Sequence, residues 1–251
     1  MIESSRDGEI ALLRLCHGKA SALDLEFCEA LERALESEER GSARALLLTG
    51  TGGIFCAGVD LRRLVAEGPS YVARFLPALD ALFLRLLRLE KPLVGALNGH
   101  AIAGGAVIAG ACDLRLCARG NGTLGVPELK VGVPFPATAV ALARELFPPA
   151  LLGQALYLGR IWRAEECLAA GIVDELVEPA ELLPRALERA RELAAIPAAS
   201  FALSKRLRRR PALEELARHA TRDASETLAV WSSPEALAAV DAYVQRTLRR
   251  N

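Results

Sequence analysis

Two glycine-containing loops offer backbone N–H groups of the kind that bind a negatively charged oxygen. The first loop, residues 54–61, reads Ile-Phe-Cys-Ala-Gly-Val-Asp-Leu, and the second, residues 98–105, reads Asn-Gly-His-Ala-Ile-Ala-Gly-Gly. Each follows a predicted strand and leads into a predicted helix, whose first N–H groups lack partners and carry partial positive charge. In the alternative interpretation, both loops are tight turns in which glycine only relieves steric strain.

Strands and helices that alternate along the chain must position these loops. Short apolar runs predict strands at 8–15, at 44–49, directly before Asn98 and at 113–118. Apolar residues at helical spacing predict helices at 24–39, with Asp24 as the cap, and at 70–89, and a Gly/Ala-rich helix runs to about residue 111. The alternation continues to about residue 178, which favours βα units in a layered α/β architecture.

The remaining segment, 179–251, predicts helices only, with breaks near Pro197, Pro211 and Pro234. No low-complexity linker precedes it, so we expect these helices to pack on the core or on a neighbouring subunit. The basic run at 205–210 could contact phosphate, but such a run on a predicted helix is more typical of a solvated face.

The composition is that of a globular protein of balanced charge. The 251 residues include 31 Lys+Arg and 31 Asp+Glu, which argues against nucleic-acid binding through overall charge. Six scattered cysteines without a Cys-x-x-Cys pair indicate reduced thiols and a cytoplasmic location, and we see no signal peptide. The uncharged segment 92–112 contains Asn98, His100 and five glycines, so we expect a buried core segment and no membrane span.

Several patterns that carry other chemistries are missing from the sequence. They are the phosphate-binding Gly-x-x-x-x-Gly-Lys loop, the dinucleotide-binding Gly-x-Gly-x-x-Gly, the Gly-x-Ser-x-Gly elbow and His-Glu-x-x-His. Three widely spaced histidines, with no spaced Cys/His set, argue against a metal site. We therefore expect neither a metal ion nor a redox cofactor.

In their order and spacing, the two loops resemble the motifs of the crotonase family, the enoyl-CoA hydratases and isomerases. The family marks are Phe-x-Ala-Gly-x-Asp-Leu and, about 40 residues further on, Asn-Gly-x-Ala-x-x-Gly-Gly. The resemblance covers nearly the whole chain. It implies an α/β fold with a crotonase-like spiral of ββα units over residues 1–190. It also implies a C-terminal helical region, residues 191–251, that packs on the core and on trimer neighbours.

The resemblance further implies an acyl-CoA thioester substrate. Its two oxygen-binding donors, the oxyanion hole, correspond to the backbone N–H groups of Val59 and Gly104. Other contacts with the substrate or its coenzyme A arm are implied for Ala57, Gly58, Asp60, Leu61, Gly105 and Pro127. Coenzyme A enters as part of the substrate, so no separate cofactor is expected. The implied assembly is a homotrimer or a dimer of trimers.

Glu128 is the implied acid/base group. Hydratases of this family use two glutamates, but Val107 occupies the first of those positions here and only the second, Glu128, is intact. Water addition needs one group to activate water and another to handle the α-proton, so the missing carboxylate disfavours hydration. Taken alone, Glu128 would be interpreted as a solvated loop acid, the usual environment of glutamate, and it is the two upstream loops that favour the catalytic role.

One carboxylate is enough for a 1,3-proton shift that converts 3-enoyl-CoA to trans-2-enoyl-CoA. The chain resembles the mitochondrial-type 3,2-trans-enoyl-CoA isomerase branch at residues 103–105 and 133–135, among other segments. Isomerisation in fatty-acid metabolism is the favoured prediction. Hydration of 2-enoyl-CoA or another enolate reaction, such as decarboxylation, is the alternative. A non-catalytic acyl-CoA-binding or RNA-binding module is the alternative from outside the enzymes.

Four nearby side chains are expected to stay outside the chemistry. Asp60, at the first turn of a predicted helix, is expected to cap it. Cys56 lacks an assignable His/Asp partner that would make it a nucleophile. Asp113 is expected to end the Gly/Ala helix or to pair with a basic side chain, and His100 to lie at the surface or to be hydrogen-bonded in the core.

Overall fold

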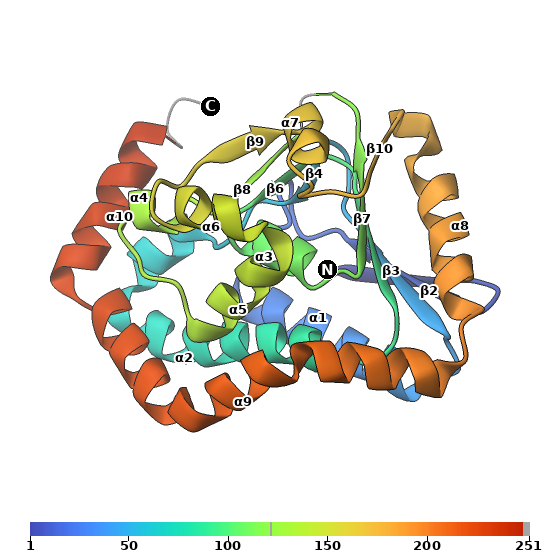
Figure 1. Cartoon of the computed structure of the whole chain (residues 1–251). Coiled ribbons are helices and arrows are strands. Elements are labelled where there is room, and N and C mark those ends of the chain that lie inside the picture. The colour runs from blue at the N-terminus through green and yellow to red at the C-terminus, as the bar shows by residue number, and fades with distance from the viewer. Residues whose placement is uncertain (121, 248–251) are drawn as a thin grey trace.

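A six-stranded sheet forms the centre of the computed structural model, which describes residues 1–120 and 122–247 (Figure 1). Its strands, in spatial order, are β1 (Ile2–Asp7), β2 (Ile10–Leu15), β3 (Ala45–Thr49), β5 (Leu93–Leu97), β7 (Leu114–Ala118) and β10 (Glu175–Val177). The edge strand β1 runs antiparallel to β2, and the other neighbours are parallel. The predicted strands at 8–15, 44–49 and 113–118 are thereby confirmed.

A smaller sheet lies beside it. Its order is β4 (Ile54–Cys56), β6 (His100–Ile102), β8 (Thr123–Gly125) and β9 (Ile161–Arg163). The first three strands are parallel, and β9 is antiparallel to β8.

The helices fill the connections and the C-terminal part of the chain. They are α1 (Leu25–Arg40), α2 (Leu61–Arg88), α3 (Gly104–Gly110), α4 (Glu128–Val131), α5 (Ala137–Leu146), α6 (Pro149–Leu156), α7 (Ala164–Ala169), the 3-10 helix η1 (Pro179–Glu181), α8 (Leu182–Ala194), α9 (Ala198–Trp231) and α10 (Pro234–Thr247).

Three consecutive units follow one plan. Each has a strand of the large sheet, a short strand of the small sheet and a helix: β3-β4-α2, β5-β6-α3 and β7-β8-α4. This spiral of ββα units confirms the predicted fold class. Because β4, β6 and β8 are adjacent and parallel, the turns that follow them lie at one edge of the small sheet. We call these turns the first, second and third junction.

Helices cover both faces of the large sheet, as its apolar strands require. Both β3 and β5 are buried along their whole length, which is typical of parallel strands covered on both sides. On one face lies α8, whose buried stripe repeats every four residues at Leu182, Ala186, Ala190 and Ala194. The opposite face carries α1, α2 and α3 (Figure 1).

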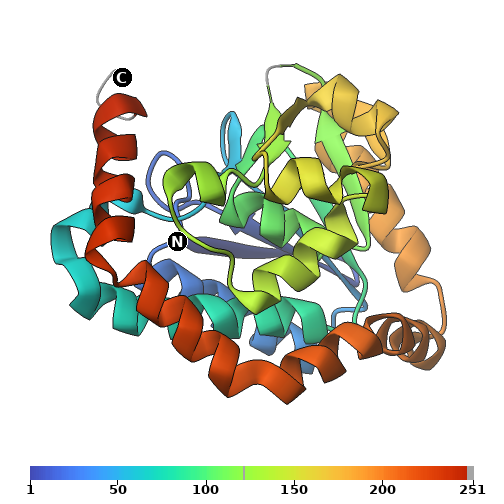
Figure 2. The same ribbon diagram turned by 60° about the vertical axis from the view of Figure 1, so that its left-hand side comes forward.

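The C-terminal helices wrap around this core. Helix α9 passes beneath α2 and α5, and α10 returns beside the start of α2 (Figure 2). The predicted breaks near Pro197 and Pro234 are confirmed, but the break at Pro211 is wrong. The helix continues there because residues on both sides of the proline are held against the core, Arg209 before it and Leu213 after it. The division at residue 190 stays a prediction.

The basic run at 205–210 is a solvated face only in part. Arg206, Arg208 and Arg210 are exposed as the sequence predicted, but two members of the run are buried. Lys205 and Arg209 are only 6% and 2% exposed. They stand four residues apart and therefore share one face of α9, which is turned inward. The Lys205 ammonium group donates to a carboxylate oxygen of Asp113 at 2.6 Å, which confirms the expected pairing of Asp113 with a basic side chain.

Two elements differ from the sequence prediction. Helix α2 begins at Leu61, earlier than the predicted residue 70, and bends at Gly68, where φ is 65°. Strand β1 had no sequence signal, because an exposed edge strand needs no apolar pattern. The uncharged segment 92–112 contains β5, β6 and α3, and none of the described helices has the length and apolarity needed to cross a membrane.

Candidate active site

A glycine and a capped helix start shape the first junction, between β4 and α2. Gly58 has a φ of 83°, in the left-handed region that favours glycine. A β-carbon at Gly58 would lie 2.6 Å from the Ala103 Cβ and 2.8 Å from the Ile102 carbonyl oxygen, so the glycine also permits contact with the second junction. Asp60 accepts a hydrogen bond from the Arg63 N–H at 3.0 Å, which confirms it as the cap of α2.

The Val59 N–H is held in a fixed direction by a short parallel bridge to Leu23. The Leu23 N–H donates to the Gly58 carbonyl at 2.7 Å, and the Leu23 carbonyl accepts from the Asp60 N–H at 2.9 Å. In such a bridge, the residue between the two bonded positions turns its own N–H to the opposite side. No hydrogen bond within the described part of the chain uses the Val59 N–H, which leaves this donor for a ligand.

The second junction, between β6 and α3, contains a strained residue. Ala103 has a φ of 53°, a conformation that costs a non-glycine residue about 1 to 3 kcal/mol and often marks a functional site. Gly104 follows as the first residue of α3, and its N–H makes no hydrogen bond to another described residue. At Gly105, a β-carbon would lie 2.1 Å from the Cys56 carbonyl oxygen, so only glycine fits there.

The two predicted donors stand on adjoining pieces of backbone. A β-carbon at Gly58 would lie 3.2 Å from the Gly104 nitrogen, and the Val59 nitrogen is bonded to the carbonyl carbon of Gly58. Leu23 touches both pieces, since its Cδ1 would lie 2.5 Å from a β-carbon at Gly104. No sequence pattern marked Leu23 or Ala103, because their roles arise from contacts between distant segments.

At the third junction, Glu128 is the first residue of α4 and is only 8% exposed. Its Oε2 is buried and has no hydrogen-bond partner among the residues that the structure describes. Burial raises the pKa of this carboxyl group from 4.5 to about 8, because the charged form loses its hydration. The alternative of a solvated loop acid is therefore wrong. A buried, unpaired carboxyl group with a raised pKa is typical of a catalytic base.

All the residues predicted to act on or contact the substrate lie in these three junctions. The first holds Ala57, Gly58, Val59, Asp60 and Leu61, the second holds Gly104 and Gly105, and the third holds Pro127 and Glu128. A backbone hydrogen bond ties the second junction to the third, because the Ala103 N–H donates to the Gly125 carbonyl at 2.8 Å. The roles of these residues stay predictions.

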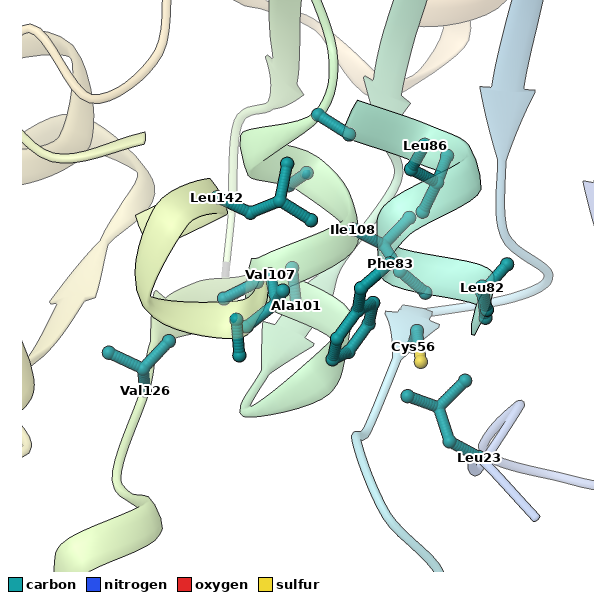
Figure 3. Packing of buried hydrophobic residues seen from close by; sticks show 14 of the residues in the cluster. Leu23, Cys56, Leu82, Phe83, Leu86, Ala101, Val107, Ile108, Val126 and Leu142 are labelled. Atoms are coloured by element: carbon teal, nitrogen blue, oxygen red, sulfur yellow. The ribbon is translucent and has the colours of Figure 1, made fainter. Parts of the chain in front are cut away.

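Val107, which stands where a second glutamate would be, is fully buried in α3. Figure 3 shows its side chain among those of Ala101, Val126 and Leu142. All three neighbours are apolar and could not form a hydrogen bond or ion pair with a carboxylate, so the side chain at position 107 contributes to core packing. Of the two glutamate positions of the two-glutamate design, the site therefore keeps one, Glu128.

Cys56 is an unsuitable nucleophile in this setting. Its thiol is fully buried and donates to the Ser21 carbonyl at 3.0 Å. Burial raises the pKa of the thiol to about 12, so the reactive thiolate is scarce at neutral pH. His100 is half-buried, and its Nδ1 lies 2.8 Å from the Thr123 hydroxyl, which confirms the expected hydrogen-bonded histidine.

A mostly apolar cavity of about 580 Å³ lies between α2, the start of α5 and α9. Its polar lining includes Asp80 and Thr138, which are hydrogen-bonded to each other at 2.6 Å. Val59, Gly104 and Glu128 do not line it. The cavity and the three junctions are thus separate features of the molecule.

Comparison with known proteins identifies the family. The sequence model for enoyl-CoA hydratase/isomerase matches residues 5–247. The chain belongs to this family. A carnitinyl-CoA dehydratase of Salmonella arizonae is 35% identical over 223 residues, which cover 88% of this chain and 81% of that protein.

Solved structures of this family share the fold. The human mitochondrial delta3-delta2-enoyl-CoA isomerase superposes with a TM-score of 0.94 at 27% identity, covering 100% of this chain and 99% of that one. An enoyl-CoA hydratase of Mycobacterium marinum gives a TM-score of 0.78 at 28% identity, covering 93% and 99% of the two chains. The protein is thus an enzyme of the enoyl-CoA hydratase/isomerase family, and acyl-CoA chemistry is consistent with that membership.

Proposed function

We propose that the protein isomerises 3-enoyl-CoA to trans-2-enoyl-CoA. The Glu128 carboxylate takes a proton from C2 of the thioester. The electron pair of the broken C–H bond moves towards the carbonyl group, so that negative charge builds on the thioester oxygen and a dienolate forms, conjugated from C1 to C4. The neutral Glu128 then returns the proton to C4, and the double bond comes to lie between C2 and C3. Atoms and charge balance, and no electrons are exchanged with a second molecule, so the reaction needs no redox cofactor.

The observation that carries the proposal is the solitary state of Glu128. In the part of the chain that the structure describes, it is the one carboxyl group with a buried, unsatisfied oxygen. A pKa near 8 makes it a much stronger base than an ordinary glutamate. A proton shift within one substrate needs a single such group, and Val107 offers no second.

The backbone donors of the first two junctions complete the proposed mechanism. The Val59 and Gly104 N–H groups would hold the thioester oxygen as it gains negative charge. Removing one such donor typically costs about 2.7 to 4 kcal/mol of transition-state stabilisation. Because both donors are backbone groups, a side-chain substitution at Val59 changes packing without removing the hydrogen bond.

Hydration or dehydration is the second candidate function. It is favoured by the 35% identity with a protein named carnitinyl-CoA dehydratase. In that reaction a second group has to handle the water, and the buried valine at 107 leaves Glu128 to do both tasks. This is why isomerisation is the stronger proposal.

Product mass separates the two candidates. Purified protein is incubated separately with 3-hexenoyl-CoA and with crotonyl-CoA. Isomerisation leaves the mass of the first substrate unchanged and moves its double bond into conjugation with the thioester, whereas hydration adds one water to the second. Rapid hydration of crotonyl-CoA without isomerisation of 3-hexenoyl-CoA would overturn the proposal.

The assembly as a homotrimer or a dimer of trimers stays a prediction. Light scattering on the purified chain measures its mass directly. The cytoplasmic location is likewise a prediction, which fractionation of the source cells tests.

A further inference from the structure

The three junctions are not tied together equally. Asn98 links the first two units strongly: its side-chain oxygen accepts from the Gly50 N–H, and its side-chain nitrogen donates to the Gly52 and Ile54 carbonyls. In addition, the His100 N–H donates to the Gly53 carbonyl at 3.0 Å. Strand β6 is thus anchored on the β4 side before it reaches the second junction.

The tie between β6 and β8 has fewer hydrogen bonds outside the strand ladder. The two strands pair at only two positions, Ala101 with Leu124 and Ile102 with Gly125. The hydrogen bond from the Ala103 N–H to the Gly125 carbonyl closes the end of this ladder that faces the site. Yet this ladder sets where Glu128, three residues after Gly125, lies relative to the Gly104 N–H.

At the other end of the ladder, two side chains meet. The His100 Nδ1 and the Thr123 Oγ1 are 2.8 Å apart, and within the described residues this is the one side-chain hydrogen bond that joins β6 to β8. Glycines stand directly before both residues, at Gly99 and Gly122. The backbone just before the ladder therefore has no other side chain that could fix its register.

We propose that His100 is a positioning residue, which acts through Thr123 to fix β8 on β6 and thereby the separation between the Gly104 N–H and the Glu128 carboxyl group. The inference rests on the proposed function, since it assigns these two groups to one reaction. A displacement of about 1 Å between reacting groups can cost as much as 10²-fold in rate. Removing the His100–Thr123 hydrogen bond leaves the rest of the ladder in place, so the rate should fall by only part of this factor.

The test compares, at each of the two positions, a variant that removes the hydrogen bond with one that can keep it. Thr123→Val removes the hydroxyl and Thr123→Ser keeps it; His100→Ala removes the ring and His100→Asn keeps a polar atom near the Nδ1 position. The readout is the exchange of the C2 protons of butyryl-CoA for deuterium, which needs the oxygen-binding donors and the base but no double-bond shift. Isomerisation of 3-hexenoyl-CoA is measured in parallel.

The expected result is a fall in kcat of about tenfold for Thr123→Val and for His100→Ala, with KM changed less than about twofold. The Ser and Asn variants should recover most of this loss. The double variant Thr123→Val/His100→Ala should be no slower than either single one, because both remove the same bond.

A matched control separates positioning from general stability. The Thr49 hydroxyl donates to the Ala96 carbonyl at 2.8 Å in the large sheet, away from the junctions. Thr49→Val should lower Tm much as Thr123→Val does, yet leave kcat unchanged. If Thr123→Val exchanges protons at the wild-type rate, or if Thr49→Val slows exchange equally, the inference is wrong.

A wild-type enzyme that exchanges protons but does not isomerise would overturn the proposed function alone. One that does neither would overturn both.

Discussion

Glu128 and Lys205 are both buried ionisable side chains, yet among the described residues only the side chain of Lys205 is hydrogen-bonded to other residues. Their exposed fractions are 8% and 6%. The Lys205 ammonium group donates to the Asp113 carboxylate at 2.6 Å and to the Lys91 carbonyl at 2.8 Å. The Glu128 Oε2 has no hydrogen-bond partner within residues 1–120 and 122–247. Burial moves both groups towards their neutral forms, raising the pKa of Glu128 and lowering that of Lys205, each to about 8.

This difference indicates that Lys205 stabilises the fold, whereas Glu128 is left available to interact with a ligand. The salt bridge of Lys205 joins α9 to the turn between α3 and β7, and Arg209 adds hydrogen bonds to the Leu86, Leu87 and Ala111 carbonyls. A buried charge is tolerated when it is paired in this way. An unpaired carboxyl group does not stabilise the fold, so its presence at the third junction points to chemistry.

The largest expected effect follows from removing the base. Glu128→Gln keeps the shape of the side chain but cannot take the C2 proton, so turnover of 3-hexenoyl-CoA should fall by about 10²-fold to 10⁴-fold. Substrate binding should persist, as measured by calorimetry with the saturated hexanoyl-CoA. Glu214→Gln, an exposed change on α9, serves as the control and should keep full activity. If Glu128→Gln turns over substrate at the wild-type rate, Glu128 is not the catalytic base and its lack of a partner has no functional meaning.

The next effect concerns the paired region. Lys205→Met removes the hydrogen-bonded ion partner of the Asp113 carboxylate and leaves it with Arg209 at 3.7 Å, so the free energy of unfolding should fall by about 3 kcal/mol, the low end for breaking a buried ion pair. Urea unfolding measures this loss. Activity per folded molecule should change little, because the salt bridge lies outside the three junctions. The exposed variant Arg206→Met should unfold like the wild type; equal losses in both variants would contradict the structural role.

The raised pKa of Glu128 predicts the pH dependence of catalysis. The base must be ionised, so kcat/KM should rise about tenfold per pH unit at lower pH and level off near pH 8. Rates measured from pH 5 to 9.5 check this. If kcat/KM is instead constant over this pH range, the pKa of the Glu128 carboxyl group lies near the ordinary glutamate value of 4.5, and the group is hydrated.

The same shift predicts a smaller effect on stability. Between pH 4.5 and about 8, the folded protein keeps a proton on Glu128 that the unfolded chain has released, so the free energy of unfolding falls as pH rises through this window. Glu128→Gln does not titrate there. Its stability relative to the wild type should therefore increase with pH across the window, as followed by urea unfolding at several pH values. A constant difference would contradict the shifted pKa.

The sequence predicted the parts of the site that depend on local pattern. The two glycine loops each follow a predicted strand, so their places at the junctions follow from the order of elements. The role of Glu128 came instead from the resemblance to the crotonase family, because a lone Pro-Glu segment has no local pattern that marks a site. The cap at Asp60 is also a local feature, set within one turn of helix.

The rest depended on which segments meet in three dimensions. The contact of Leu23 with the first two junctions, and the pairing of His100 with Thr123, arise from strand register. The burial of Lys205 depends on which face of α9 turns inward, because a run of basic residues has no apolar stripe to indicate that face.

The central claim is that one carboxyl group carries a proton from C2 to C4 of the same substrate. Its most direct test uses 3-hexenoyl-CoA with deuterium at C2 in a single turnover in ordinary water, with the product analysed by mass and NMR. The account predicts deuterium at C4 in a fraction of the 2-hexenoyl-CoA formed, and no such transfer by Glu128→Gln. Complete loss of the label to water, or undiminished transfer by the variant, would contradict it.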